Sequence, residues 1–407
     1  MHKLKTITLN PAEIARIRAG HPWVYSKSIA SGDAGIEAGD QVRVVGPRHD
    51  VIGVGFYHPD SKIRIRIVRR EDAPIDSDWL AWRIQKAIDY RKLCYPGRNV
   101  IRLVNSESDG LSGLIIDRYD DAVLFQISSL GMERMKDSII QAIRSVIAPS
   151  ILIERNDVSN RRFEGLPEIR HIHESSLSEE ALTQFTVKLA GLTYHLDLMN
   201  GNKTGLYLDQ IENHELSKPI IAAHPEARVL DCFSYIGGFS LTAASCENTR
   251  SVIGLDQSAD AVRLAALNAT TNGVDSRCQF IQTNVFDWLR NASSGQSDVA
   301  QDPFDVIILD PPSFTKNRHT VDAAIRGYKE LHVRALKLLK PGGHLLTYSC
   351  SHHISADLLR SIAFEASLDT HRELIESHAF YQAKDHPVVP CVPETFYLKG
   401  FAYFTNN

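Results

Sequence analysis

The C-terminal half of the chain alternates between short apolar runs and longer amphipathic stretches. Residues 306–309 form an apolar run that Asp310 and two prolines end, and residues 344–348 form another. Between these runs, residues 323–340 have the periodicity of a helix and are followed by a Pro-Gly-Gly turn signal. Because strand and helix patterns alternate from residue 227 to the end, the sequence predicts an α/β domain built on a doubly wound parallel sheet.

The N-terminal segment has a different pattern, in which short β-rich runs are split by turn residues. Residues 41–45 and 52–57 are two such runs, and residues 62–70 alternate strictly between apolar and basic side chains. These runs predict a small β domain over residues 1–72.

The middle of the chain mixes helical and strand patterns. Residues 78–94 have helical periodicity, and residues 114–127 contain two apolar runs around an Asp-Asp turn, which predicts a hairpin. The polar stretch 168–183 has no clear period and is expected to be a loop. We therefore expect an α+β domain over residues 73–190, followed by the α/β domain over residues 191–407.

Composition is that of a soluble globular protein. The 407 residues are too many for one ordinary core, and 43% are hydrophobic while 23% are charged. No apolar run is long enough to span a membrane, and the first residues lack the apolar core of a signal peptide. We expect a cytoplasmic protein with no membrane partner.

The charge of the chain is unevenly distributed. Residues 1–70 contain twelve Lys and Arg against six Asp and Glu, so their net charge is +6, whereas the net charge of the whole chain is −4. Lys62, Arg64 and Arg66 alternate with isoleucines and therefore share one side of the predicted strand. This row is expected either to face a polyanion such as RNA or to be an ordinary solvated surface.

The six cysteines include no Cys-x-x-Cys pair. This spacing favours reduced thiols over a disulfide scaffold or a zinc site, and no metal is expected. We expect Cys232, Cys246 and Cys278 to be small buried side chains. Cys350 is different, because it directly follows a predicted strand and is flanked by serines.

A second set of polar residues follows the strand predicted at residues 228–230. The turn 231–239 contains two glycines and leads into a helix, and the next strand ends in Asp256, 19 residues after Gly237. Such a turn lets backbone amides approach a ligand, and the acid suits a ribose diol. The turn lacks GxGxxG, which weakens a dinucleotide interpretation, and a tight turn without a ligand is the alternative.

Asp310 and Cys350 each follow a predicted strand of the same sheet. Ligands of open α/β sheets lie beyond the carboxyl ends of the strands, so a carboxylate and a thiol are expected at one edge. That pairing suits covalent catalysis in which the thiol is the nucleophile.

These motifs together carry a family resemblance. The turn 231–239, Asp256, the segment 310–314 and the segment 349–351 resemble motifs I, II, IV and VI of class I S-adenosylmethionine-dependent methyltransferases. More narrowly, the whole chain resembles bacterial 23S rRNA cytosine-C5 methyltransferases with an N-terminal PUA domain. Further similar segments are residues 20–25, 105–114 and 203–210.

The resemblance implies S-adenosylmethionine as cofactor. It implies that the turn holds the methionine part, that Asp256 holds the ribose, and that Asn284 reads the adenine where the family usually has Asp. The cofactor-binding residues expected on this basis are Asp231, Phe233, Ser234, Tyr235, Gly237, Asp256, Asn284 and Asp310.

The resemblance also implies a reaction and a partner. Carbon 5 of cytosine becomes nucleophilic once the Cys350 thiolate has added to carbon 6, while Asp310 binds the N3/N4 edge. Pro311 stiffens the turn, and Phe314 is expected to stack on a flipped base. The partner is then RNA, 23S rRNA or a ribosomal subunit precursor, and a homodimer is left open.

Three rival interpretations remain at this point. A methyltransferase could act on a purine or a non-RNA substrate, but Cys350 argues for carbon-5 chemistry. An inactive RNA-binding assembly factor would not need Asp256, Asp310 and Cys350 together. An NAD-binding oxidoreductase would be expected to carry the missing glycine motif.

Overall fold

The computed structural model describes residues 4–201, 204–294, 302–315 and 318–407. The chain divides into two compact units, which are described separately. The first unit comprises Met1–Phe185, Leu196–Leu208 and Lys384–Thr395, and the second comprises Thr186–His195, Asp209–Ala383 and Phe396–Asn407. Since the chain passes between the units several times, the three contiguous domains expected from the sequence stay a prediction.

The first unit begins with a six-stranded sheet of order β2-β6-β5-β4-β1-β3. Its alternating strand β6 buries Ile65 and Ile67 in a core with α1, as the sequence pattern predicts. The elements are β1 (Lys5–Leu9), α1 (Ile14–Arg18), β2 (Trp23–Tyr25), β3 (Ile29–Ser31), β4 (Gln41–Val45), β5 (Val51–Tyr57) and β6 (Ile63–Arg69).

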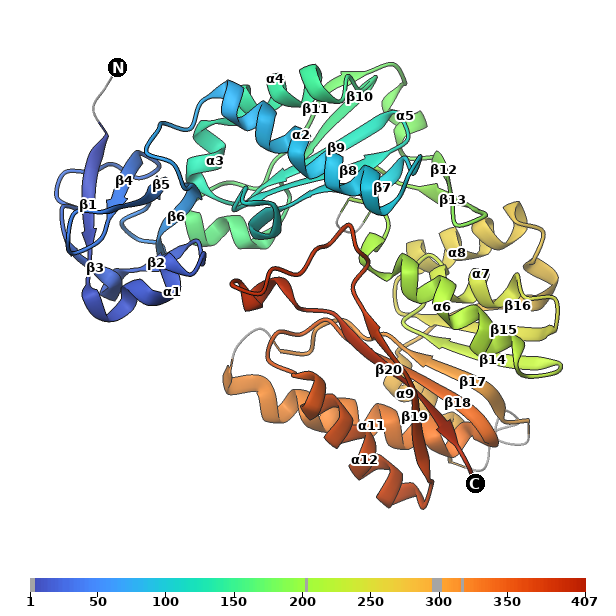
Figure 1. Ribbon diagram of the computed structural model, residues 1–407. Helices are drawn as coiled ribbons and strands as arrows, with labels where there is room; N and C mark the ends of the chain where they lie inside the picture. The colour runs from blue at the N-terminus through green and yellow to red at the C-terminus, as the bar shows by residue number, and fades with distance from the viewer. Residues whose placement is uncertain (1–3, 202–203, 295–301, 316–317) are drawn as a thin grey trace. The chain divides into compact units, whose positions relative to one another are not determined.

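A second sheet of the first unit has the order β11-β10-β9-β8-β7, with α2 and α4 packed together on it (Figure 1). The elements are α2 (Ser77–Cys94), β7 (Val100–Asn105), β8 (Leu114–Tyr119), β9 (Ala122–Ile127), α3 (Leu130–Arg134), α4 (Lys136–Val146), β10 (Ile151–Arg155), β11 (Arg170–Ser175) and α5 (Glu179–Leu182). The antiparallel β8–β9 hairpin confirms the expected turn.

The expectation of a loop over residues 168–183 is wrong. This stretch forms β11, which pairs with β10, and the short helix α5. β11 is an edge strand, and its side chains are half-buried or exposed. An edge strand of this kind buries no apolar row, so its sequence shows no period.

The second unit contains a seven-stranded sheet of order β16-β15-β14-β17-β18-β20-β19. Its strands are β14 (Ala227–Cys232), β15 (Thr249–Asp256), β16 (Cys278–Gln282), β17 (Phe304–Leu309), β18 (Leu339–Ser349), β19 (Leu374–Tyr381) and β20 (Lys399–Thr405). A small hairpin, β12 (Phe185–Leu189) and β13 (Leu192–Leu196), precedes it.

The sheet of the second unit is parallel from β16 to β18 but not throughout. β20 lies antiparallel to β18 and to β19. The expectation of a parallel sheet is therefore wrong for β20, which runs against the other strands, because an alternating sequence pattern does not reveal strand direction.

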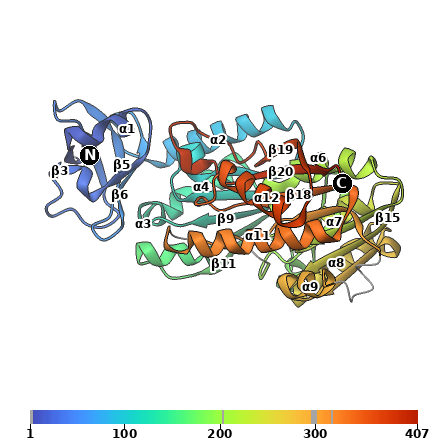
Figure 2. The ribbon, with the colours of Figure 1, turned by 90° about the horizontal axis from the view of Figure 1, so that it is seen from below.

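Helices cover both faces of this sheet (Figure 1). Alternate core side chains of β14, β17 and β18 pack on α6 and α7 on one face and on α9, α11 and α12 on the other. Figure 2 shows α11 and α12 side by side. The helices are α6 (Ile211–Ala222), α7 (Gly238–Ala244), α8 (Ala259–Thr271), α9 (Val285–Ala292), α11 (Val321–Leu338) and α12 (Ala356–Thr370). This two-faced arrangement confirms the predicted fold class.

The boundary between α11 and β18 differs slightly from the prediction. The helix ends at Leu338, and Pro341–Gly343 lie within β18 rather than before it. The register between β17 and β18 shifts between Phe304 and Val306, so the Pro-Gly-Gly sequence marks an irregularity inside the strand.

Two further features of the described residues concern disulfides and membrane-spanning helices. The six cysteines, all of which are described, form no disulfide. Over the ranges given above, no helix combines the length and the apolar character that crossing a membrane requires.

Candidate active site

The register of the central strands brings the predicted site residues to one edge of the sheet. Leu255, Cys232, Leu309 and Thr347 lie side by side on β15, β14, β17 and β18. Because adjacent strands are about 5 Å apart, the residues directly after this row form one continuous edge. That edge carries the 233–237 turn, Asp256, Asp310 and, slightly further along β18, Cys350.

Asp231 lies beneath this edge at the end of β14. Its Oδ2 accepts hydrogen bonds from the backbone N–H and the hydroxyl of Ser240, at 2.9 and 2.6 Å. Its buried Oδ1 and the buried Ser234 hydroxyl have no hydrogen-bond partner within the part of the chain that the structure describes. Burial raises the pKa of Asp231 to about 7.

The turn after Asp231 has an unusual backbone. Phe233, Tyr235 and Gly237 all have positive φ, at 69°, 49° and 90°. For the two aromatic residues this conformation is strained, which is typical of ligand-binding loops. A Cβ atom on Gly238 would lie 2.4 Å from the ring of His214, so only glycine allows α6 and α7 to approach this closely.

Asp256 holds the same turn in place. Its Oδ2 accepts a hydrogen bond from the backbone N–H of Tyr235 at 2.9 Å, and its Oδ1 accepts one from Ser258 at 2.9 Å. Asp256, which is predicted to bind the ribose, therefore also fixes the backbone of the 231–239 turn. Each carboxylate oxygen has a second lone pair that a ribose hydroxyl can use.

Asn284 begins helix α9 as its N-cap. Its Oδ1 accepts hydrogen bonds from the backbone N–H groups of Phe286 and Asp287, at 3.0 and 3.3 Å. The oxygen expected to meet adenine thus already stabilises a helix end, so the adenine role of Asn284 stays a prediction.

Asp310 is held by a residue that sequence reasoning did not single out. The Gln210 side-chain amide donates a hydrogen bond to Asp310 Oδ2 at 2.9 Å, and Asn213 in turn donates to Gln210 Oε1 at 2.6 Å. Gln210 and Asn213 are both buried. The signal for Gln210 was the family-like segment 203–210, which gave no role for the amide, and Asn213 lies outside that segment.

Cys350 follows β18 and is half-buried. The Ser349 hydroxyl accepts a hydrogen bond from Tyr328 on α11 at 3.0 Å and a weaker one from the backbone N–H of Ser351 at 3.3 Å. Burial raises the pKa of Tyr328, and the nearby Cys350 and Asp310 act in the same direction. The thiol and the carboxylate therefore share one environment around Tyr328.

Phe314 and Pro311, both expected to contact RNA, contribute to packing. The Phe314 ring lies 4.8 Å from the ring of Tyr328 and 5.7 Å from that of Phe286, and Pro311 is buried. Base stacking by Phe314 stays a prediction.

Among the other cysteines of the second unit, Cys232 is buried, as expected, whereas Cys246 and Cys278 are half-buried and pack against the core. Cys232 is fully buried between strands, and burial raises its pKa well above the ordinary value. Burial also raises the thiol pKa values of Cys246 and of Cys278, the latter to about 12. None of these thiols is suited to act as a nucleophile.

The row of cations on β6 is divided between two environments. Lys62 is exposed and Arg64 is half-buried. Arg66 forms ion pairs with Glu107 and Glu164, at 3.4 and 3.2 Å. The guanidinium of Arg66 is thus already paired with carboxylates within the first unit, and its contact with RNA stays a prediction.

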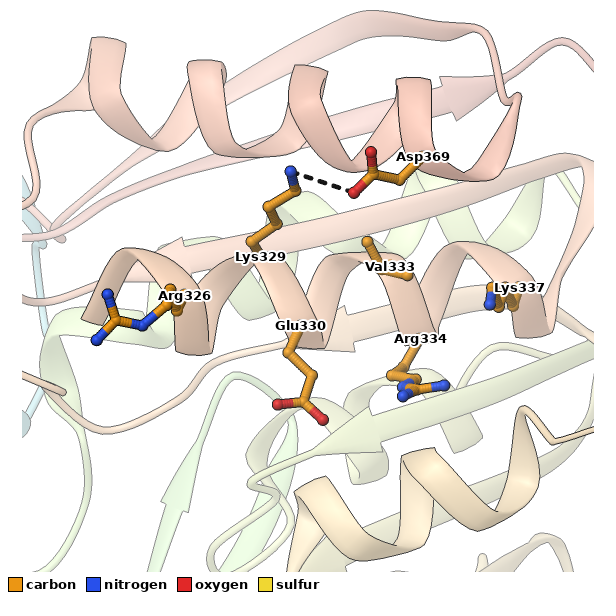
Figure 3. Close-up of a pocket in the computed structure, with 7 residues that line it drawn as sticks. All are labelled: Arg326, Lys329, Glu330, Val333, Arg334, Lys337 and Asp369. Carbon is orange, nitrogen blue, oxygen red and sulfur yellow. Dashed lines mark ion pairs between the residues drawn. The ribbon is translucent and has the colours of Figure 1, made fainter. Parts of the chain in front are cut away.

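A surface pocket of the second unit lies away from this edge, on α11 and α12 (Figure 3). Lys329 forms an ion pair with Asp369 of α12 at 3.1 Å, and Arg290 of α9 forms one with Glu330 at 3.1 Å. The lining residues are Arg326, Lys329, Glu330, Val333, Arg334, Lys337 and Asp369. They include no predicted site residue, and three of them, Lys329, Glu330 and Asp369, are held in ion pairs.

Comparison with known proteins assigns the chain to a family. Residues 7–70 match the PUA-like domain family, and residues 163–399 match the S-adenosylmethionine-dependent methyltransferase family. The chain is 37% identical over 400 residues to a ribosomal RNA large subunit methyltransferase I from Alteromonas mediterranea, covering 97% of each chain. A Vibrio cholerae protein of the same name is 36% identical over 391 residues, covering 95% of this chain and 96% of its own. The chain belongs to this family of S-adenosylmethionine-dependent methyltransferases.

Solved structures support the fold. A chain from Streptococcus mutans described as a SAM-dependent methyltransferase superposes with a TM-score of 0.81 at 19% identity, covering 98% of this chain and 100% of its own. A methyltransferase solved in complex with SAH gives the same TM-score, identity and coverage. At this identity the likeness concerns the fold alone. The cofactor of this methyltransferase family is S-adenosylmethionine, as the sequence resemblance implied.

Proposed function

We propose that this methyltransferase forms 5-methylcytosine in 23S rRNA, or in a precursor of the large ribosomal subunit, through a covalent adduct with Cys350. The observation that carries the proposal is the shared edge of the sheet, where Cys350 and Asp310 follow neighbouring strands beside the cofactor turn. The names of the full-length relatives support ribosomal RNA as the substrate.

The cofactor fits the residues around the turn. The unpartnered Asp231 Oδ1 is a buried acceptor, and an ammonium group such as that of methionine is a suitable partner for it. We assign the ribose contact to Asp256, which holds the turn through the Tyr235 N–H; Phe233, Ser234, Tyr235 and Gly237 form that turn. Asn284 lies at the start of α9 for the adenine. When bound, S-adenosylmethionine supplies the methyl group.

The residues of the chain divide the chemistry between them. The Cys350 thiolate forms a bond to carbon 6, and the electrons of the C5–C6 double bond make carbon 5 the nucleophile that takes the methyl group. Asp310, oriented by Gln210, binds the N3/N4 edge of the base. Loss of the carbon-5 proton to a base and cleavage of the sulfur–carbon bond restore the ring and the thiolate.

The N-terminal sheet is the proposed RNA-binding part of the first unit. The PUA-like match over residues 7–70 and the +6 charge of residues 1–70 support this role. We assign phosphate contacts to Lys62, which directly precedes β6, and to Arg64 on β6. We place the protein in the cytoplasm, where ribosomes are assembled, and keep a homodimer as a hypothesis for sedimentation analysis.

Trapping with a fluorinated substrate tests the covalent mechanism. RNA containing 5-fluorocytosine should form a stable adduct with the wild-type protein, because fluorine cannot leave as the proton does. Cys350→Ser should form no adduct and should lose methylation while still binding the cofactor. Cys246→Ser, which removes a thiol away from this edge, is the control and should behave as wild type.

The same experiment distinguishes the rival substrate. If Cys350→Ser keeps substantial activity, or if mass spectrometry places the methyl group on a nitrogen, carbon-5 chemistry is excluded. A methyltransferase acting on a purine then becomes the better interpretation.

A further inference from the structure

A buried lysine lies near the proposed nucleophile, on a strand outside the four motifs named in the sequence analysis. Lys399 is the first residue of β20, which pairs antiparallel with β18 so that Lys399 lies opposite Ser349. Its side chain is 3% exposed. Full burial of a lysine is rare without a compensating partner, which makes this position informative.

The ammonium group of Lys399 is held by two main-chain oxygens, one of which belongs to the residue after Cys350. Nζ donates hydrogen bonds to the carbonyl oxygen of Ser351, the residue after Cys350, and to that of Tyr397 at 2.9 Å. An ammonium group has three N–H donors, so these two carbonyls leave one donor for a further acceptor.

Within the part of the chain that the structure describes, no carboxylate neutralises this cation. Over the described residues, no Asp or Glu lies within ion-pair distance of Lys399, in contrast to Lys340 on β18, which pairs with Asp305 at 2.8 Å. Burial lowers the pKa of Lys399 to about 8, and the neighbouring Cys350 acts in the opposite direction. Lys399 is therefore a cation at neutral pH and is electrostatically coupled to the thiol.

We propose that Lys399 is a positioning residue that keeps Cys350 in its thiolate form. The inference rests on the proposed covalent function of Cys350. The thiol loses its proton to water before the substrate binds, and the negative charge is then stabilised by the nearby ammonium group. Lys399 itself neither bonds to the base nor transfers a proton in this scheme.

Other groups near Cys350 act differently on the thiolate. Asp310, after β17, carries the same charge and opposes ionisation of the thiol. Tyr328 on α11 is neutral and donates a hydrogen bond to the Ser349 hydroxyl, and His352 follows in the next turn with its ring 6.0 Å from that of Tyr397. Among these groups, Lys399 supplies the compensating positive charge.

Alkylation of Cys350 measures its ionisation directly. The full-length protein is treated with iodoacetamide between pH 5 and 10, and modification of the Cys350 peptide is followed by mass spectrometry. In the wild type we expect a midpoint below the value of about 8.5 for an ordinary cysteine. A wild-type midpoint at or above 8.5 would overturn the proposal without any variant.

Two substitutions separate charge from hydrogen bonding. Lys399→Gln keeps an amide donor for the carbonyls but removes the charge, and should slow Cys350 alkylation at pH 7 by about tenfold, equivalent to one pKa unit. Lys399→Arg keeps the charge and should stay within about threefold of wild type. Lys337→Gln removes an exposed cation of α11 and should change nothing. An unchanged alkylation profile in folded Lys399→Gln contradicts the proposal.

Methylation gives a second readout that a purely structural lysine would not produce. The activity of Lys399→Gln should be low at pH 7 and should recover toward wild type near pH 9, where the thiol ionises without help. The two proposals can fail separately. If Cys350→Ser still methylates RNA, the covalent mechanism fails, whereas the alkylation profile alone decides whether Lys399 stabilises the thiolate.

Discussion

The hydrogen bond from Gln210 to Asp310 offers a quantitative test of the proposed site. In Gln210→Ala the Asp310 carboxylate loses a donor at 2.9 Å, and the buried Asn213 amide loses its acceptor. A hydrogen bond to a charged group contributes about 1.5–3 kcal/mol. If that energy positions Asp310 in the transition state, kcat should fall by roughly one to two powers of ten, since about 1.4 kcal/mol corresponds to tenfold.

Single-turnover methylation with saturating RNA and cofactor measures this effect. Cofactor affinity, followed by calorimetry, should change by less than about threefold, and thermal melting should show that the variant is folded. The Gln85→Ala variant is the matched control, because Gln85 donates a similar hydrogen bond to Asp89 at 2.7 Å on an exposed helix surface. A folded Gln210→Ala protein with the same kcat as Gln85→Ala would refute the positioning role.

Four further predictions concern the cofactor turn and the RNA surface. The raised pKa of Asp231, about 7, means that its carboxylate becomes available for a cationic ligand as pH rises, so calorimetry should show tighter cofactor binding at pH 8 than at pH 6 and a flat profile in Asp231→Asn. The same raised pKa of Asp231 should make the ligand-free protein lose stability, relative to Asp231→Asn, as the pH rises from about 4 to about 7. The reason is that in this range the native state keeps the Asp231 proton and the unfolded state does not; equal melting curves would contradict it. Asp256→Ala removes the hydrogen bond from Tyr235 of the turn, the one from Ser258 and the proposed ribose contact, so cofactor affinity should fall at least tenfold in a folded protein, and unchanged affinity would remove this assignment. Replacing both Lys62 and Arg64 by Gln should reduce the salt dependence of RNA binding by about one to two in the log–log slope, whereas an identical slope would mean that neither residue contacts phosphate.

Local patterns were sufficient where one face of an element is buried. The strict alternation of residues 62–70 predicted β6, and the apolar runs around the Asp-Asp turn predicted the β8–β9 hairpin. The pattern failed for β11 because an edge strand with half-exposed side chains has no apolar period. It also could not show that β20 runs antiparallel, since side-chain alternation is the same in either direction.

The sequence also predicted only some residues of the candidate site. Asp310 and Cys350 could be recognised because each directly follows an apolar strand, and parallel strands bring their ends to one edge. Gln210 and Lys399 gave no such signal. One precedes a helix and the other begins the last strand, and nothing in their own neighbourhoods along the chain marks them as partners of the site.

By itself, the sequence determined the fold class, the cofactor family and the residues that follow the strand ends, because those depend on local periodicity and on short motifs. Tertiary structure decided which charges are available. It paired Arg66 with two carboxylates, used the Asn284 oxygen to cap a helix, and buried Lys399 near Cys350 without a carboxylate among the described residues. The availability of a charge depends on partners that are distant along the chain, since electrostatic and hydrogen-bonding interactions act through space and not along the sequence.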